Sequence, residues 1–118
     1  MAQPIPEPWR THVIATLRAA DDKLIAWTHQ AFQRWKQDTS GAWKYEAYDA
    51  IIVALSAAGT AGNETSAFEG QQAAYEFLFT HHPPNGGSPL TMYGKIALKS
   101  DGVRILILSA HKVERSSL

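Results

Sequence analysis

The sequence contains no cysteine, which excludes disulfide bonds and thiolate chemistry. Any zinc site would have to be built from histidine and carboxylate ligands alone. The chain also lacks an apolar run approaching the roughly 20 residues that a membrane-spanning helix needs. Residues 1–8 are rich in proline and do not form a charged segment followed by an apolar one, so they do not indicate a signal peptide. We therefore expect a cytoplasmic protein without a membrane partner.

The sequence also has no excess of positive or negative charge. The 118 residues include 11 basic and 11 acidic ones, and the formal net charge is zero. A uniformly basic nucleic-acid-binding protein is therefore not expected, although cations outnumber acids after residue 81 and allow a local basic face. Hydrophobic residues make up 45% of the chain, enough for a core without covalent crosslinks. We predict a single domain, 1–118.

The first half of the chain carries helical patterns. Apolar residues recur at helical spacing in residues 9–20 and, most clearly, in 43–58, where Gly59 follows in the place of a terminating glycine. Residues 1–8 are expected to form an extended N-terminal arm, because proline disfavours a helix interior. All four tryptophans precede residue 44, and we expect them to pack in the core of the helical layer.

Residues 23–38 allow two interpretations. One helical stripe would hold Leu24, Trp27, Ala31 and Trp35, which favours a single amphipathic helix. Alternatively, residues 24–28 form a short edge strand, and the helix begins at residue 28 or 29. The apolar run is too short for its periodicity to decide between the two.

The second half of the chain indicates a sheet. Residues 59–72 are rich in glycine, threonine, asparagine and serine and predict a flexible loop. Strands are expected at 74–80, 91–99 and 103–110, the last two joined by a tight turn. The prediction is an α+β fold, with two to three N-terminal helices packed on a three- to four-stranded antiparallel sheet.

The turn at Ser100-Asp101-Gly102 suggests a register for the final two strands. A three-residue turn with a left-handed Gly102 places Lys99 opposite Val103. A two-residue turn would instead place Lys99 opposite Arg104, a like-charge pair, so we favour the first register. Its core face would hold Met92, Gly94, Ile96, Leu98, Leu106, Leu108 and Ala110. Its opposite face would hold Tyr93, Lys95, Ser109 and His111.

This second face has the chemistry of an acid–base site. Glu76 alternates with three aromatic residues and joins the polar face if those rings face the core. A carboxylate, an imidazole and a lysine suit RNA cleavage, in which a base takes the 2′-hydroxyl proton, an acid protonates the leaving oxygen and a cation stabilises the phosphorane. The ordinary interpretation of these residues is that they form the solvent-facing polar side of strands with alternating polarity. His81 and His82 point in opposite directions on a strand, so no metal site is expected.

Two segments resemble a known group of proteins. Leu24-Ile25-Ala26-Trp27-Thr28, followed by His29-Gln30-Ala31-Phe32, is similar to the strand-to-helix opening of RelE/ParE-type toxins. Tyr93-Gly94-Lys95-Ile96 together with Ile105–Lys112 resembles the sheet of the wider RelE, HigB and MqsR group. Those proteins are small bacterial ribonucleases that a cognate antitoxin neutralises. The present chain departs from them in its neutral charge and its longer helical first half.

The resemblance implies a toxin-like, metal-independent endoribonuclease without a cofactor, and it implies RNA and an antitoxin protein as partners. It matches Lys95 and His111 to sheet positions of catalytic or phosphate-binding residues. We expect His111 to act as general acid or base, with Glu76 as its partner, while Tyr93 and Lys95 hold phosphate. The further predicted substrate-binding residues are Ser109 and Lys112. A homo-oligomer is compatible with the sequence, and the alternative function is a non-catalytic protein-binding module using the same sheet face.

Overall fold

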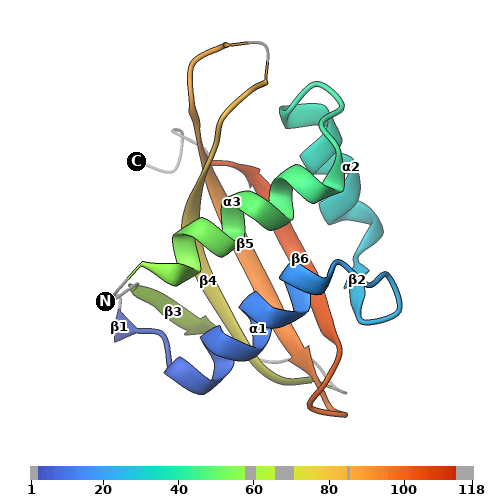
Figure 1. Cartoon of the computed structure of the whole chain (residues 1–118), viewed down its shortest axis with the longest axis vertical. Coiled ribbons are helices and arrows are strands. Elements are labelled where there is room, and N and C mark those ends of the chain that lie inside the picture. Colours follow the sequence, from blue (N-terminus) through green and yellow to red (C-terminus); the bar gives the residue numbers. More distant parts are fainter. Residues whose placement is uncertain (1–2, 58–60, 66–70, 85, 114–118) are drawn as a thin grey trace.

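The computed structural model describes residues 3–57, 61–65, 71–84 and 86–113 of the 118-residue chain. In this part of the chain, two of the three helices cross one face of a curved sheet, and the middle helix lies beside the last strand (Figure 1). Their bounds are α1 Glu7–Ala19, α2 His29–Asp38 and α3 Lys44–Ser56. None of these helices is long and apolar enough to span a bilayer. The fold is α+β with its helices toward the N-terminus, as the sequence predicts.

The described strands form one sheet in the order β1-β3-β4-β5-β6-β2. Their bounds are β1 Gln3–Pro4, β2 Ile25–Trp27, β3 Ala61–Thr65, β4 Gln71–His81, β5 Leu90–Lys99 and β6 Ile105–Lys112. The four longer strands, β3 to β6, pair with one another antiparallel, which confirms the expected sheet. Two short edge strands extend it, β1 antiparallel to β3 and β2 parallel to β6.

The ambiguous segment 23–38 adopts the second interpretation, a short strand followed by a helix. β2 pairs with the first residues of β6, and the Thr28 N–H then donates to the Ile107 carbonyl at 3.0 Å. The Thr28 side chain accepts from the Ala31 N–H and so caps α2 at its first turn. The sheet contact therefore decides a structure that the local apolar pattern left open.

Two predicted boundaries need correction. The helix α1 begins at Glu7, inside the predicted arm of residues 1–8. β3 and the first residues of β4 lie within the predicted loop of 59–72, so that prediction is wrong for 61–65 and 71–72. The rest of that segment, Gly59 included, lies outside the described residues. Pairing with β1 and β4 outweighs the low strand propensity of β3.

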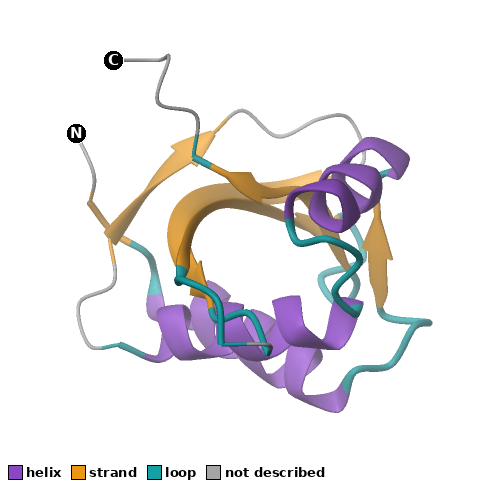
Figure 2. Ribbon diagram, turned by 90° about the horizontal axis from the view of Figure 1, so that it is seen from above, coloured by secondary structure: helices purple, strands orange, loops and turns teal. Residues whose placement is uncertain are grey.

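The core lies between the concave face of the sheet and the helices, and Figure 2 shows the strands curling around this space. Trp35 is fully buried there, and its indole N–H donates to the Ala42 carbonyl at 3.0 Å. Its ring packs edge-on against the buried His81, with the centroids 5.1 Å apart. Trp9 is also buried, but Trp43 is 71% exposed. The expectation of a core position is wrong for Trp43, because it lies just ahead of α3 as its N-cap residue.

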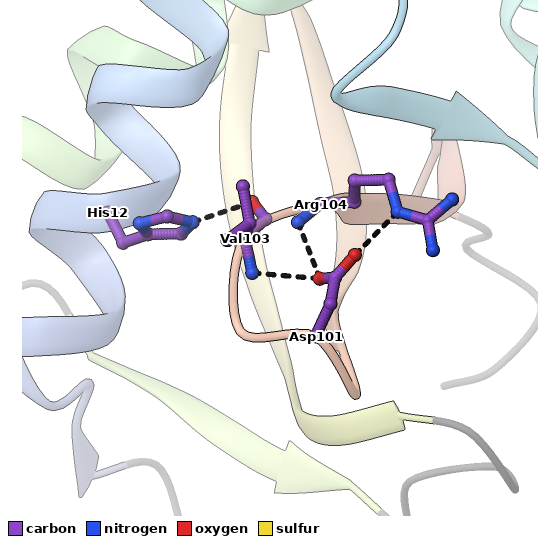
Figure 3. A network of polar contacts seen from close by, with 4 residues as sticks. All are labelled: His12, Asp101, Val103 and Arg104. Atoms are coloured by element: carbon purple, nitrogen blue, oxygen red, sulfur yellow. Dashed lines mark hydrogen bonds and ion pairs between the residues drawn. The ribbon is translucent and has the colours of Figure 1, made fainter.

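The turn between β5 and β6 is held by a carboxylate. Asp101 Oδ1 accepts from the backbone N–H groups of Val103 and Arg104, and its Oδ2 lies 2.6 Å from Arg104 Nε (Figure 3). The Arg104 guanidinium, followed by these N–H groups, holds the pKa of Asp101 well below its ordinary value. His12 of α1 also reaches the turn, with Nε2 2.7 Å from the Val103 carbonyl.

This turn overturns the favoured register near residue 100. Gly102 is left-handed, as predicted, with φ +71°, but the Lys99 N–H donates to the Arg104 carbonyl. Lys99 therefore lies opposite Arg104 rather than Val103. The like-charge objection fails because Asp101 pairs with Arg104. As a consequence, Ile105 and Ile107 face the core and are fully buried. Leu106 and Leu108, which the favoured register placed in the core, are only half-buried.

Gly94 is a position where packing demands glycine. A Cβ there would lie 2.8 Å from Phe77 Cε2 and 3.1 Å from Phe79 Cε1, and both rings are buried. We expect Gly94→Ala to lower the free energy of unfolding by about 1–3 kcal/mol, since an overpacked core must shift its rings. Urea denaturation measures this. Thr91→Val, at an exposed position of the same strand, is the control and should change stability by less than about 0.5 kcal/mol.

Candidate functional site

A β-bulge in β6 decides which side chains share the outer face of the sheet. Ile96 pairs with Ile107 and Lys95 pairs with Ser109, so Leu108 is an extra residue in β6. An extra residue reverses the alternation of side chains beyond it. Ile107 faces the helices before the bulge, and Ser109 faces away from them after it. The predicted grouping on the outer face is thus present, although the register that led to it was wrong.

Three strands contribute to this outer face. Glu76 of β4 lies opposite Lys95 of β5, which lies opposite Ser109 of β6. In the next row, Tyr93 lies opposite His111. Side chains directly opposite each other have Cβ atoms about 4.5–5.5 Å apart, so these five half-buried residues form one patch. We call Glu76, Tyr93, Lys95, Ser109 and His111 the outer-face cluster.

Lys112 does not belong to the outer-face cluster. It follows His111 directly in β6, and neighbouring residues of a strand point to opposite faces. It lies opposite Met92, which is fully buried on the helical side. Its backbone N–H donates to the Asp38 carboxylate of α2 at 3.0 Å, so Lys112 connects β6 to that helix through its main chain.

Tyr93 and Glu76 are directly hydrogen-bonded. The Tyr93 hydroxyl donates to Glu76 Oε2. Burial, and after it the hydrogen bond and the charge of Glu76, raise the pKa of Tyr93 well above its ordinary 10.0. Tyr93 is therefore a neutral phenol at neutral pH and a donor of hydrogen bonds. Glu76 is in consequence the partner of Tyr93, whereas the sequence interpretation paired it with His111.

The His111 ring lies against Tyr93, with the centroids 5.2 Å apart and an angle of 36° between the planes. Its Nδ1 lies 2.8 Å from the Lys112 carbonyl oxygen. A carbonyl oxygen only accepts hydrogen bonds, so this contact requires a proton on Nδ1. In neutral imidazole the other nitrogen, Nε2, then carries the lone pair that can take a proton from a ligand.

Helix α2 adds two polar side chains beside this cluster. A pocket of about 160 Å³ lies between α2 and β6, and it is lined by Gln30, Ala31, Arg34, Leu108, Ser109 and His111. The Arg34 guanidinium also lies 3.7 Å from the Asp38 carboxylate. The sequence analysis missed Gln30 and Arg34. Their spacing of four residues places them on one helix face, but nothing in the sequence shows that this face meets β6.

The described residues include no group of three or more histidine, aspartate or glutamate side chains arranged to hold a metal ion. His81 is buried against Trp35, and His82 is exposed. Burial lowers the pKa of His81, an effect that the charge of Glu46 partly opposes. The two histidines therefore occupy different environments, as their alternation along the strand predicts.

The raised pKa of Tyr93 can be measured directly. In a chain labelled with ¹³Cζ-tyrosine, the resonance that Tyr93→Phe removes should titrate well above pH 10.0. Glu76→Gln should bring that pKa part of the way down, because burial remains. The folded state keeps a proton that the unfolded state loses near pH 10, so this contribution to stability is present below pH 10 and is lost as the pH rises through the folded pKa. Titration of Tyr93 at or below its ordinary value would contradict the geometry.

The comparisons with other proteins add no guide to function. No protein-family model, curated protein or solved structure matches the chain. The resemblance to RelE-like toxins thus remains an expectation from short sequence segments.

Proposed function

We propose that this chain is a toxin-like endoribonuclease that cleaves RNA without a metal ion, and that a cognate antitoxin protein neutralises it. The observation that carries the proposal is the outer-face cluster, which brings an imidazole, an ammonium group, a phenol and a carboxylate to one face of the sheet. Acid–base cleavage of RNA uses these groups. The antitoxin is proposed from the sequence resemblance alone.

In the proposed reaction, His111 is the general base. Its Nε2 takes the proton of the ribose 2′-hydroxyl as that oxygen attacks the neighbouring phosphorus. The bond from phosphorus to the 5′-oxygen breaks, and the leaving oxygen takes a proton from the Lys95 ammonium group. The products are a 2′,3′-cyclic phosphate and a 5′-hydroxyl, and proton exchange with water restores both side chains.

The other residues would stabilise charge and hold the substrate. The Tyr93 hydroxyl is kept protonated, and on substrate binding it would turn its single hydrogen from Glu76 Oε2 to a non-bridging phosphate oxygen as negative charge develops there. Before substrate binds, Glu76 positions that phenol through its hydrogen bond. Ser109 and Arg34 line the pocket beside His111, where a guanidinium suits a second phosphate.

The first test concerns His111. We expect His111→Ala to lower the rate of RNA cleavage by about 10²–10⁴-fold, the range for loss of a general base. Cleavage of an end-labelled RNA in the presence of EDTA measures this rate, and mass spectrometry identifies the cyclic phosphate. Induced expression of the wild-type chain in bacteria should arrest growth, and His111→Ala should relieve the arrest.

His12→Ala is the matched control, because His12 lies on α1, on the other side of the sheet, and its ring bonds to the Val103 carbonyl in the β5–β6 turn. It should cleave at close to the wild-type rate. Absence of RNA cleavage by the wild-type chain would refute the proposal. If His111→Ala and His12→Ala lost the same share of the cleavage rate, the loss would come from impaired folding and not from the missing base. Unimpaired growth with wild-type protein would favour the non-catalytic binding module.

A second test examines the proposed role of Lys95 as the general acid. Lys95→Ala should slow cleavage of ordinary RNA by about 10²-fold or more. A substrate with sulfur in place of the bridging 5′-oxygen has a leaving group that departs without a proton. On that substrate Lys95→Ala should recover most of the wild-type rate, whereas His111→Ala should stay slow. If both variants recover equally, or neither does, Lys95 is not the group that protonates the leaving oxygen.

A further inference from the structure

Along one edge of β4, the described residues pair with only part of the strand. β3 pairs with β4 at Asn63–Thr65 against Ala74–Glu76. β4 continues to His81 and stays paired with β5 along that whole length. Beyond Glu76, no described residue pairs with β4 on the β3 side, and the two β3 residues before Asn63 pair with β1 instead. Figure 1 shows α3 crossing this upper part of β4. We call residues 77–81, seen from this side, the free edge of β4.

The ladder pattern shows which backbone groups this edge presents. The Thr91 carbonyl accepts from the Val113 N–H on the β6 side, so the odd-numbered residues of β5 bond to β6 and the even-numbered ones to β4. The residues opposite those even-numbered ones are the odd-numbered residues of β4. Leu78 and Thr80 therefore direct their N–H and C=O groups away from β5, toward the side where no described strand pairs with them. The Glu76 carbonyl, which faces β3 at Gly62, fits the same pattern.

A groove runs along this edge between α3 and β4, with a volume of about 460 Å³. Its apolar lining includes Ala50, Val53 and Ala54 of α3 and Leu78 and Phe79 of β4. Val53 is 73% exposed and Leu78 is 59% exposed. An apolar channel beside a strand edge with unpaired backbone groups is the usual setting for the addition of a further strand.

The acidic residues that line the groove indicate which kind of peptide segment would bind there. Glu46 and Asp49 of α3 line it, and among the described residues its lining contains neither lysine nor arginine. A segment that carries a lysine or arginine among apolar residues complements this lining, whereas an acidic segment would be repelled. In an added strand, alternate side chains would lie against α3, and the others would lie beside Leu78 on the outer face.

We propose that the free edge of β4 binds an extended segment of another protein as an added strand. Main-chain hydrogen bonds to Leu78 and Thr80 hold the segment, apolar side chains fill the groove beside Val53, and a cationic side chain faces Glu46 and Asp49. This surface adjoins the outer-face cluster, since Leu78 lies opposite Tyr93, but it shares no residue with that cluster, and the inference does not depend on ribonuclease activity.

The test begins with selection of random dodecapeptides, displayed on phage, against the whole protein. The enriched peptides should alternate apolar residues with others and include a lysine or arginine. A synthetic copy of the most enriched peptide then serves as the probe, and fluorescence polarisation measures its affinity. Selection that enriches no such sequence would overturn the proposal.

Three variants challenge the contacts. Val53→Glu puts a charge into the groove at an exposed position, and Thr80→Pro removes an outward N–H where an edge strand tolerates proline. Each should weaken peptide binding by about tenfold or more, and Asp49→Lys should weaken it by about fivefold or more. The control Glu7→Lys alters an exposed acid of α1 and should stay within about twofold. Val53→Glu keeps the test valid if Thr80→Pro does not fold.

Amide hydrogen exchange reports strand addition itself. Bound peptide should slow exchange at the Leu78 and Thr80 amides, because each gains a hydrogen bond. Binding without protection of these two amides would overturn the proposal, as would equal binding of an acidic copy of the peptide. If the free protein is already dimeric by sedimentation and protected at the same amides, a second copy of the chain occupies the edge and the proposal is wrong.

Discussion

The outer-face cluster depends on the bulge at Leu108. A strand with an unbroken period of two would place Ser109 and His111 on the same face as Ile105 and Ile107, against the helices. Burying polar side chains there without partners would cost about 1–3 kcal/mol for each. The extra residue lets one short strand supply aliphatic side chains to the core along its first half and polar ones to the opposite face along its second.

The edge of β6 changes its partner at the same place. β2 pairs with β6 only as far as Ile107, whose carbonyl accepts the Thr28 N–H. Beyond that point α2 covers the edge, and its Asp38 carboxylate accepts the Lys112 N–H. Because the helix replaces the strand where the bulge begins, the side chains of Gln30 and Arg34 reach the second half of β6. The bulge and the strand-to-helix junction thus build the site together.

The sequence predicts the features that depend on neighbouring residues along the chain. Alternation within β5 is enough to separate Tyr93 and Lys95 from Met92 and Ile96, and helical spacing is enough to locate α1 and α3. A bulge is different, because Leu108 is one more aliphatic residue in an aliphatic run and only the pairing with β5 marks it as extra. The outer-face grouping was nevertheless predicted, since a register error of two residues leaves a side chain on its face.

The other differences have the same origin in contacts between distant segments. The like-charge rule misjudged Lys99 and Arg104 because it ignored Asp101, which neutralises the guanidinium from within the turn. β3 has a sequence typical of a loop and becomes a strand because it lies between β1 and β4. Its Gly62 sits so close to the Glu76 carbonyl that a side chain would overlap it, a requirement that only the assembled sheet reveals.

The charges near the outer-face cluster limit how it would recognise RNA. Glu76 lies opposite Lys95, and Asp38 lies beside Arg34, so each cation has a carboxylate close to it. In a chain of zero net charge, this arrangement produces little long-range attraction for a polyanion. Few phosphates would be neutralised, and affinity would then depend only weakly on salt. Recognition would instead depend on close contacts, among them bases stacked near the paired rings of Tyr93 and His111.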